Sequence, residues 1–396
     1  MNPFEDDLKQ RLDVLRDQDL YRELRTVDSP QGVCIQIGGK TLLNFSSNDY
    51  LGLANEPILR EAAIKAVEKF GAGSGASRLI CGSLAPLHEL DEAIASYKGT
   101  EAALSFSTGY ATALGTICAL VGRDDVIAVD KLVHACVVDG ARLSGAKLRV
   151  FPHNDLDKLE HILKWARQPG VASTPSKRVL VVTESIFSMD GDAAPLKKII
   201  ALKDKYGAWL MLDEAHASGL YGKHRRGMAE EAGVSDQVEI QMGTLGKAIG
   251  AAGGYISGSR RLIDLLVNRA RSFIFSTAPV PAAAAAATAG IRYIQSGDGE
   301  TRRQLLWRRV DELRSAIGGQ NPEIRSAIVP IQIGGESAAL EASAALRERN
   351  IFVPAIRYPT VARGSARLRV TLTAAHSAED ISLLAAALKP FRSFSS

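Results

Sequence analysis

Four short apolar runs constrain the fold of this chain more than any other feature. They cover residues 103–106, 126–129, 179–183 and 209–212, and stretches of helix-forming sequence separate them. Strands that are apolar along nearly their whole length are typical of a mostly parallel sheet covered by helices on both faces. We therefore predict a large α/β domain over residues 46–290, with short glycine-marked turns between its strands and helices.

Polar segments directly follow these four runs. They are residues 107–110, 130–134, 184–188 and 213–216. In open parallel sheets, ligands bind beyond the carboxyl ends of the strands. Polar segments in these equivalent positions therefore indicate one binding site at that edge of the sheet.

A lysine lies on a further loop of the same kind. Lys247 stands in the glycine-marked loop 243–250, after a strand expected at 238–242. Most loop lysines are only solvated. Asp213, His216 and His134, however, follow strands of the same sheet, and an amine with a carboxylate and imidazoles is what pyridoxal 5'-phosphate requires. The amine forms a Schiff base with this cofactor, and the carboxylate keeps its pyridine nitrogen protonated.

Two glycine-containing segments also have plain structural explanations. Residues 71–78 contain three glycines but no Walker or dinucleotide pattern. A flexible loop without a binding role is therefore a sufficient explanation for them. Residues 107–110 precede a helix expected at 111–120, where backbone N–H groups could bind an anion or simply be capped. Local sequence leaves both interpretations open.

The single candidate residues differ in how easily they are explained by structure alone. A lone histidine such as His134 is more often a surface or core residue. For Glu184 and Ser188, the plain explanation is that they cap a turn and have no further role. Asp213 ends an apolar strand, and a buried carboxylate needs a cationic or hydrogen-bonding partner. A protonated pyridine nitrogen would be such a partner.

Composition and cysteine usage narrow the class of protein. The net charge of +4, from 48 basic and 44 acidic side chains among 396 residues, gives no indication of nucleic-acid binding. We expect reduced, buried cysteines in a cytoplasmic protein and no metal site, because no CxxC pair occurs among Cys34, Cys81, Cys118 and Cys136. No signal-peptide pattern begins the sequence, and no apolar run approaches ~18 residues, so we expect no membrane span.

The N-terminal residues 1–45 predict a small arm that packs on a neighbour. A helix is expected over residues 4–23 from the spacing of Leu8, Leu12, Leu15 and Leu20. A hairpin is expected from the strand-like residues 33–37 and 41–45. Arg22 falls near the end of the expected helix, where a cation offsets the helix dipole.

Residues 291–396 predict a separate α+β domain. Its expected elements are helices at 301–317 and 337–350 and strands at 328–333 and 367–372. The alanine run 282–287 predicts a helix that leads into it. Arg357 lies on a turn in this domain. Such an arginine usually faces solvent, but its fork of donors also suits a carboxylate.

Several segments, in order along the chain, resemble the α-oxoamine synthases. They are residues 44–53, 71–78, 183–192, 213–216 and 244–247, and the resemblance runs nearly end to end. That family consists of fold-type I pyridoxal phosphate enzymes, which condense an amino acid with an acyl thioester and release CO₂. The resemblance implies an α/β fold with a mostly parallel, seven-stranded central sheet. It also implies a homodimer with shared active sites.

The resemblance gives the central candidates their catalytic roles. Lys247 would hold the cofactor and then take the proton from the substrate Cα. Asp213 would pair with the pyridine nitrogen, and His216 would hydrogen-bond the phenolic oxygen of the ring. His134 would stack on the ring face.

The resemblance implies further cofactor and substrate contacts. The other cofactor contacts are Gly109, Tyr110, Thr244, Glu184, Ser188, Ser276 and Thr277. The first three would hold the phosphate, and the last two would reach it from a second subunit. The substrate contacts are Arg22, Asn48, His134, Arg357 and Thr360. Of these, Arg357 would bind the carboxylate of the amino acid.

Within the family, residues 356–376 most resemble the branch that joins L-alanine to a pimeloyl thioester in biotin synthesis. The acyl donor would be pimeloyl-CoA or pimeloyl-acyl carrier protein. Tyr358 departs from that branch, which commonly has proline there, and residues 358–360 are also similar to 5-aminolevulinate synthase. Branches that use glycine or serine therefore stay open. A non-catalytic partner subunit is disfavoured, because the lysine, the aspartate and both histidines are all present.

Overall fold

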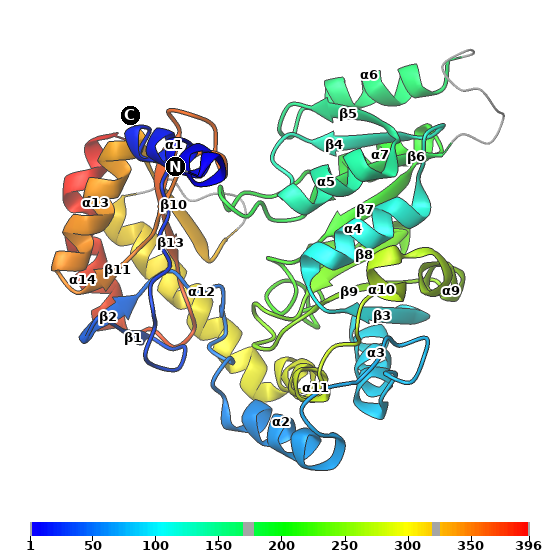
Figure 1. The fold of residues 1–396 in the computed structure, drawn as a ribbon, viewed down its shortest axis with the longest axis horizontal. Helices are drawn as coiled ribbons and strands as arrows, with labels where there is room; N and C mark the ends of the chain where they lie inside the picture. The colour runs from blue at the N-terminus through cyan, green and yellow to red at the C-terminus, as the bar shows by residue number, and fades with distance from the viewer. Residues whose placement is uncertain (1, 169–177, 319–324, 395–396) are drawn as a thin grey trace. The chain divides into compact units, whose positions relative to one another are not determined.

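The chain forms two compact units in a computed structural model that describes residues 2–168, 178–318 and 325–394 (Figure 1). The large unit consists of residues 51–188 and 192–303. The small unit consists of residues 1–50, 189–191 and 304–396.

A seven-stranded sheet forms the centre of the large unit, in the order β3-β9-β8-β7-β6-β4-β5. Only the two pairings made by β9 are antiparallel, so the predicted mostly parallel α/β sheet is confirmed. Its strands are β3 Ala102–Phe106, β4 Val126–Asp130, β5 Lys147–Phe151, β6 Val179–Glu184, β7 Trp209–Asp213, β8 Ile240–Thr244 and β9 Gly254–Gly258. β5 and β9 are not among the predicted strands, because β5 carries exposed charged residues and β9 begins and ends at glycine.

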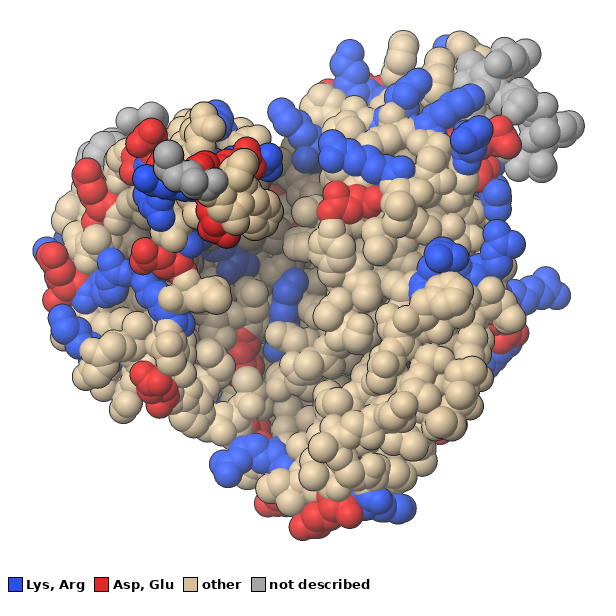
Figure 2. All heavy atoms as spheres, viewed as in Figure 1, with Lys and Arg blue, Asp and Glu red and all other residues tan. Residues whose placement is uncertain are grey.

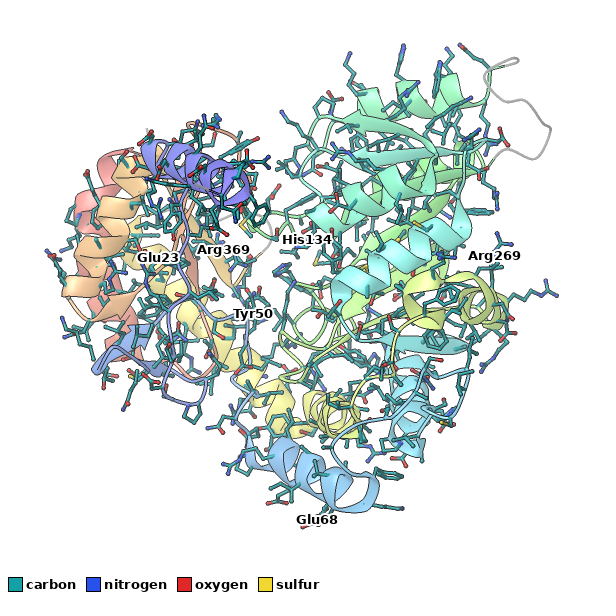
Figure 3. The ribbon with its side chains drawn as sticks, in the orientation of Figure 1. Glu23, Tyr50, Glu68, His134, Arg269 and Arg369 are labelled. Atoms are coloured by element: carbon teal, nitrogen blue, oxygen red, sulfur yellow. The ribbon has the colours of Figure 1, made fainter. Side chains whose placement is uncertain are left out.

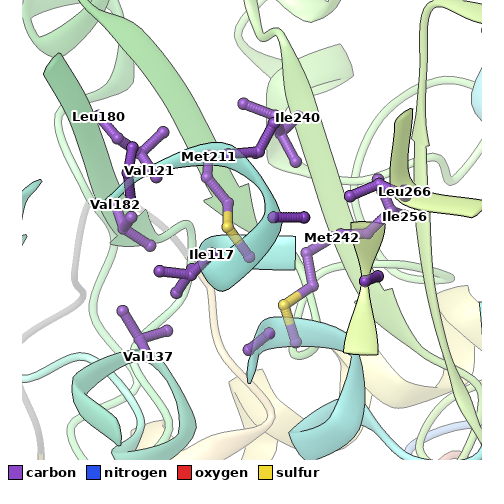
Figure 4. Packing of buried hydrophobic residues seen from close by; sticks show 14 of the residues in the cluster. Ile117, Val121, Val137, Leu180, Val182, Met211, Ile240, Met242, Ile256 and Leu266 are labelled. Carbon is purple, nitrogen blue, oxygen red and sulfur yellow. The ribbon is translucent and has the colours of Figure 1, made fainter. Parts of the chain in front are cut away.

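Helices and apolar side chains build the core of the large unit. The helices are α2 Pro57–Phe70, α3 Ala85–Lys98, α4 Gly109–Leu120, α5 Ala135–Ser144, α6 Leu156–Ala166, α7 Leu196–Lys205, α8 Met228–Glu231, α9 Arg260–Arg269, α10 Arg271–Ile274 and α11 Pro281–Gln295. Figure 4 shows Ile117 of α4 and Val137 of α5 packed with Val182, Met211 and Met242 of the sheet. Because these strands are apolar along their length, this buried layer fixes the sheet beneath the loops at its carboxyl edge.

The small unit contains two short sheets and three complete helices among the described residues. Its elements are α1 Pro3–Asp17, β1 Cys34–Ile37, β2 Lys40–Asn44, β10 Ile328–Gly334, α13 Glu336–Glu348, β11 Ile351–Phe352, β12 Ala355–Ile356, β13 Ala366–Thr371 and α14 Ala378–Leu388. The predicted hairpin is confirmed, with Gly38 and Gly39 at positive φ in its turn. β2 also pairs in parallel with β11, so the arm and the C-terminal residues share a sheet.

The N-terminal helix is shorter than predicted. α1 ends at Asp17, and Asp19 adopts a left-handed φ of 55°. The expected end near residue 23 is therefore wrong, because leucine spacing continues to Leu20 although the backbone leaves the helix before it. Leu20 is buried within the small unit, while Leu8, Leu12 and Leu15 are 38–40% exposed.

The helix that continues from one unit into the other is α12, Gly297–Ile317. α11, which contains the alanine run, belongs wholly to the large unit, so the prediction that this run leads into the C-terminal domain is wrong. The predicted domain boundaries at residues 45 and 290 stay predictions.

The cysteines are free but differ in burial. Cys34 and Cys81 are exposed, contrary to the expectation of buried thiols, while Cys136 is buried. Among the described residues, none of the helices combines the length and apolar character needed to cross a membrane.

Candidate functional site

Lys247 and His216 meet at the carboxyl edge of the central sheet. Lys247 lies in the loop after β8, and its Nζ is 2.8 Å from Nε2 of His216, which follows β7. Asp213 ends β7 with 5% of its surface exposed, and its Oδ1 accepts a hydrogen bond from the Ala215 N–H at 2.9 Å. Burial raises the pKa of Asp213, although the nearby Lys247 and His134 oppose the shift. A cationic ligand would stabilise this carboxylate.

Glu184 is another buried carboxylate at this edge. It ends β6, and its Oε2 accepts a hydrogen bond from the Ser188 N–H at 3.0 Å, so it does cap the turn. Its Oε1 is buried without a hydrogen-bond partner among the described residues. Burial, reinforced by the charge of Asp213, raises the pKa of Glu184 to about 8.

His134 lies between the end of β4 and the start of α5, and it is labelled in Figure 3. Its Nδ1 accepts a hydrogen bond from the Cys136 N–H at 3.3 Å, so it caps α5. Desolvation lowers the pKa of His134, while the charge of Asp213 acts in the opposite direction. A neutral imidazole at this position can lie flat on an aromatic ligand without the cost of burying a charge.

The N-terminus of α4 is arranged to receive an anion. Thr108 caps the helix by accepting from the Ala111 N–H at 3.0 Å, and Gly109 and Tyr110 form the first turn. A Cβ on Gly254 would come within 2.7 Å of the Gly109 Cα, so a glycine in β9 lets this helix end approach the sheet closely. First-turn N–H groups lack helical partners and favour phosphate.

Thr244, at the end of β8, also lies close to Gly109. A Cβ on Gly109 would be 3.9 Å from the Thr244 Oγ1, while that hydroxyl donates to the Gly253 carbonyl at 3.0 Å. Tyr110 is 44% exposed, and its hydroxyl donates to Asp139. Gly109, Tyr110 and Thr244 are thus brought together in the large unit.

Ser276 and Thr277 follow α10 in the same unit. Thr277 forms a β-bridge with Ser77, and the Ala278 N–H donates to the Ala76 carbonyl at 3.0 Å. The glycine-rich loop 71–78 is therefore held by the 276–278 segment rather than being a free flexible loop. Within the described residues, the structure shows Thr277 paired with that loop and not with Thr244 or Gly109.

The small unit holds the four other predicted substrate contacts. Arg22 lies beyond the end of α1, so the prediction that it offsets the helix dipole is wrong. Its Nη2 donates to the Tyr358 carbonyl at 2.8 Å. The guanidinium of Arg357 donates in return to the carbonyls of Asp19 and Tyr21. Thr360 joins this group through its N–H, which donates to the Arg357 carbonyl at 3.0 Å.

Arg357 is not the solvent-facing arginine that its turn predicts. Only 8% of it is exposed, and its Nε is buried without a partner among the described residues. Burial and the neighbouring Arg22 lower the pKa of Arg357. An added carboxylate would offset both effects.

Asn48 lies beside an arginine that the sequence did not single out. Its Oδ1 accepts from the Arg369 Nη1 at 3.1 Å, and the same nitrogen donates to the Thr371 Oγ1 at 3.0 Å. Arg369 lies on β13, whose residues are all buried, and Figure 3 marks it in the small unit. The available signal was the pair Arg367 and Arg369 two residues apart on a strand, since both side chains then lie on one face.

Two clusters of charged side chains also escaped prediction, of which the first is buried. Lys98 pairs with Glu214 at 2.5 Å, with at most 1% of either side chain exposed. His153 bridges Asp130 and Asp192. Nothing in the sequence indicates these pairs, because their members lie far apart along the chain. Among the described residues, no group of three or more His, Cys, Asp or Glu side chains is placed to hold a metal ion.

The chain belongs to the aminotransferase class I and II family, whose model matches residues 40–388. Among its similar proteins is the 8-amino-7-oxononanoate synthase of Anaeromyxobacter sp. (strain Fw109-5), 50% identical over 384 residues, covering 96% of this chain and 94% of that protein.

Solved structures show the same fold. A serine palmitoyltransferase variant from S. paucimobilis with a bound PLP–myriocin aldimine is 28% identical with a TM-score of 0.89, covering 98% of both chains. The 8-amino-7-oxononanoate synthase of Francisella tularensis is 26% identical with a TM-score of 0.73, covering 89% of this chain and 97% of that one.

Proposed function

We propose that this chain condenses L-alanine with a pimeloyl thioester, giving 8-amino-7-oxononanoate, CO₂ and the free thiol, with pyridoxal 5'-phosphate as cofactor. The reaction belongs to biotin biosynthesis, and the protein acts in the cytoplasm. The observation that carries the proposal is the Lys247–His216 contact beside buried Asp213. It occurs in a chain half-identical to an 8-amino-7-oxononanoate synthase over nearly its whole length.

The residues present fit the cofactor at both ends. Asp213 is a buried carboxylate whose pKa is raised by burial, and a protonated pyridine nitrogen would offset that burial by stabilising the ionised form. The first turn of α4 and Thr244 suit the phosphate. When bound, the cofactor supplies an electron sink for the pair of electrons left at the substrate Cα.

The remaining chemistry falls to side chains of this chain. Lys247 holds the cofactor and, as the neutral amine, takes the proton from the substrate Cα. His216, within hydrogen-bond distance of Lys247, would donate to the phenolic oxygen of the ring. His134 would cover the ring face, and Glu184 with Ser188 would complete the cofactor contacts.

The small unit supplies the substrate contacts. Arg357 binds the carboxylate of alanine, since a buried guanidinium with an unpartnered Nε favours an anionic ligand. Arg22, Asn48 and Thr360 complete the contacts with the amino acid and the thioester.

A parallel assay of alanine, glycine and serine tests the reaction. Thioester consumption should be fastest with alanine. Glycine should be a slow substrate rather than a rejected one, because one methyl contact is worth only about 1–3 kcal/mol. A clear preference for glycine or serine would move the chain to another branch of the family.

We also infer that the active protein is a homodimer with shared active sites. α1 presents Phe4, Leu8, Leu12 and Leu15 to solvent, and Phe275, directly before Ser276 and Thr277, is 70% exposed. Apolar surface of this kind favours a protein partner. Mixing a Lys247→Ala subunit with a Ser276→Ala/Thr277→Ala subunit should restore activity, because a mixed dimer keeps one intact site. No recovery in demonstrably mixed dimers would exclude the sharing.

Charge-reversal variants of one basic surface can test whether the pimeloyl group arrives on coenzyme A or on acyl carrier protein. Figure 2 shows lysine and arginine side chains gathered over β5 and α6, where Lys147, Arg149, Lys158 and Lys164 are exposed. An acidic acyl carrier protein would be attracted to such a surface. Reversing these charges should impair turnover of the carrier-linked substrate more than that of pimeloyl-CoA, if the carrier protein is the donor.

A further inference from the structure

His153 has no assigned role, yet it bridges two carboxylates in the large unit. Its Nδ1 is 3.1 Å from the Asp130 Oδ1, and its Nε2 is 2.7 Å from the Asp192 Oδ2. Asp130 ends β4, His153 follows β5, and Asp192 lies in the loop after β6. One imidazole therefore ties together three segments at the carboxyl edge of the sheet.

The geometry favours the charged form of the ring. An ionised carboxylate only accepts hydrogen bonds, so both ring nitrogens must donate, and only the imidazolium can do this. Burial opposes the charge, but the hydrogen bonds to Asp130 and Asp192 outweigh it and raise the pKa of His153 to about 10. Within the described residues, the uncharged groups against the ring are the Asn154 amide and the edge-on ring of Phe187. The amide Nδ2 lies 3.2 Å from Nε2 and, like Nε2, donates to the Asp192 Oδ2, at 3.3 Å.

The loop that contains Asp192 also carries proposed cofactor contacts. Its two arms pair through the Phe187 N–H to the Asp192 carbonyl at 2.9 Å and the Ala194 N–H to the Ser185 carbonyl at 3.1 Å. The Ser188 N–H completes the first arm by donating to Glu184. The tip, residues 189–191, belongs to the small unit. Asp192 is thus the first residue of the returning arm, and a bond to it fixes where that arm lies.

A second side chain reinforces the same attachment. Asn154, at a left-handed φ of 55°, donates from Nδ2 to the Ala193 carbonyl at 3.2 Å, and its N–H donates to the Asp130 Oδ2 at 2.9 Å. Both the side chain of Asp192 and the backbone beside it are therefore held from the end of β5.

We propose that His153 is a positioning residue that, as the imidazolium, ties Asp192 to Asp130 and so holds the arms 185–188 and 192–194 in the conformation that presents Glu184 and Ser188 to the cofactor. It touches neither cofactor nor substrate. Only the link to the cofactor rests on the proposed function, since the holding of the arms concerns this chain alone.

Hydrogen exchange of the full-length protein without added cofactor tests the holding directly. His153→Gln keeps the size but cannot donate to both carboxylates. Asp192→Asn removes one carboxylate and is the milder change. Each should speed amide exchange in residues 185–194 about tenfold, the lower end for a lost hydrogen bond to a charged group. Exchange in β4 and β7 should not change. His161→Gln, at an exposed histidine of α6, is the matched control.

Cofactor binding and pH separate positioning by the imidazolium from a merely structural role. Pyridoxal phosphate should bind about tenfold more weakly to His153→Gln than to His161→Gln. The stability advantage of wild type over His153→Gln in urea should be full below pH ~6.5, the ordinary histidine pKa. It should disappear as the pH rises through about 10. Unchanged exchange at 185–194, or an advantage that is independent of pH, would overturn the proposal. Changed exchange with no cofactor binding by any form would instead count against the proposed function.

Discussion

Asp213 and Glu214 are neighbours in the chain and both are buried, but their surroundings differ in kind. Glu214 receives Lys98 Nζ at 2.5 Å and the Ala229 N–H at 2.8 Å. Asp213 accepts the Ala215 N–H, and its raised pKa shows that the charges around it do not compensate for burial. The chain therefore completes the environment of Glu214 itself and leaves that of Asp213 to be completed by a ligand. A buried charge matched by the chain is structural, whereas one left short of a counter-charge marks a site.

The largest expected effect comes from breaking the matched pair. Lys98→Met leaves Glu214 buried without its cation and should lower the free energy of unfolding by about 3–5 kcal/mol. Asp213→Asn keeps the acceptor for Ala215 and removes a poorly compensated charge, so it should change stability by no more than about 1 kcal/mol. Urea unfolding measures both.

A double variant checks the reason for that difference. Lys98→Met/Glu214→Gln keeps an acceptor for the Ala229 N–H but removes the buried charge, so it should recover part of the lost stability. Equal stability of Lys98→Met and Asp213→Asn would break the comparison between the two carboxylates.

Arg357 tests whether one buried charge can be partly matched by the chain and still bind a ligand. Its guanidinium holds the carbonyls of Asp19 and Tyr21, yet its Nε is buried without a partner among the described residues. Arg357→Ala should weaken binding of alanine and glycine alike by about 2–5 kcal/mol, because both present the same carboxylate. Steady-state kinetics would show a raised KM, with the visible absorbance of the bound cofactor unchanged.

The matched control for Arg357 is Arg363→Ala. Arg363 donates to Gln18 and lies over the Tyr358 ring, but it is exposed. The Arg363→Ala variant should have a KM for alanine within about threefold of wild type. Unaltered alanine kinetics in Arg357→Ala would show that Arg357 only holds the N-terminal arm, through the carbonyls of Asp19 and Tyr21, and does not bind the substrate carboxylate.

Glu184 should show an effect on stability that depends on pH. Its pKa is raised to about 8, so the fold favours the protonated form, and stability is lost as the pH rises from about 4.5 through 8. Glu184→Gln cannot ionise. Without cofactor, this variant should therefore gain stability relative to wild type between pH 5 and 8 in urea unfolding. A constant difference across this range would show that Glu184 is matched like Glu214.

The sequence predicts the parallel sheet and the large-unit cluster because these depend on local pattern. Apolar strands carry their own signal, and Asp213, Glu184 and Lys247 are recognised from their places after strands. The structure brings Lys247 to His216 as that pattern requires. Where the chain leaves the helical pattern, as at Asp19, spacing alone gives the wrong boundary.

The missed features depend on contacts between residues far apart in the sequence. Lys98 and Glu214, or His153 and Asp192, become partners only when the fold brings helix and loop ends together. The partners of Arg22 and Arg357 are backbone carbonyls, which any residue provides and which therefore leave no sequence signal. The contact of Arg369 with Asn48 likewise left no signal, because the residues of β13 are all buried and the sequence of this strand is typical of a core strand.

Borohydride reduction of the purified protein, followed by peptide mapping by mass spectrometry, tests the contrast between the two buried sites most directly. The cofactor should become covalently attached to Lys247, and Lys98, held by Glu214, should stay unmodified. Lys247→Ala should fold normally, lose the visible absorbance and show no attachment. Attachment to Lys98, or a wild-type Lys247 that carries no cofactor after reduction, would contradict the account.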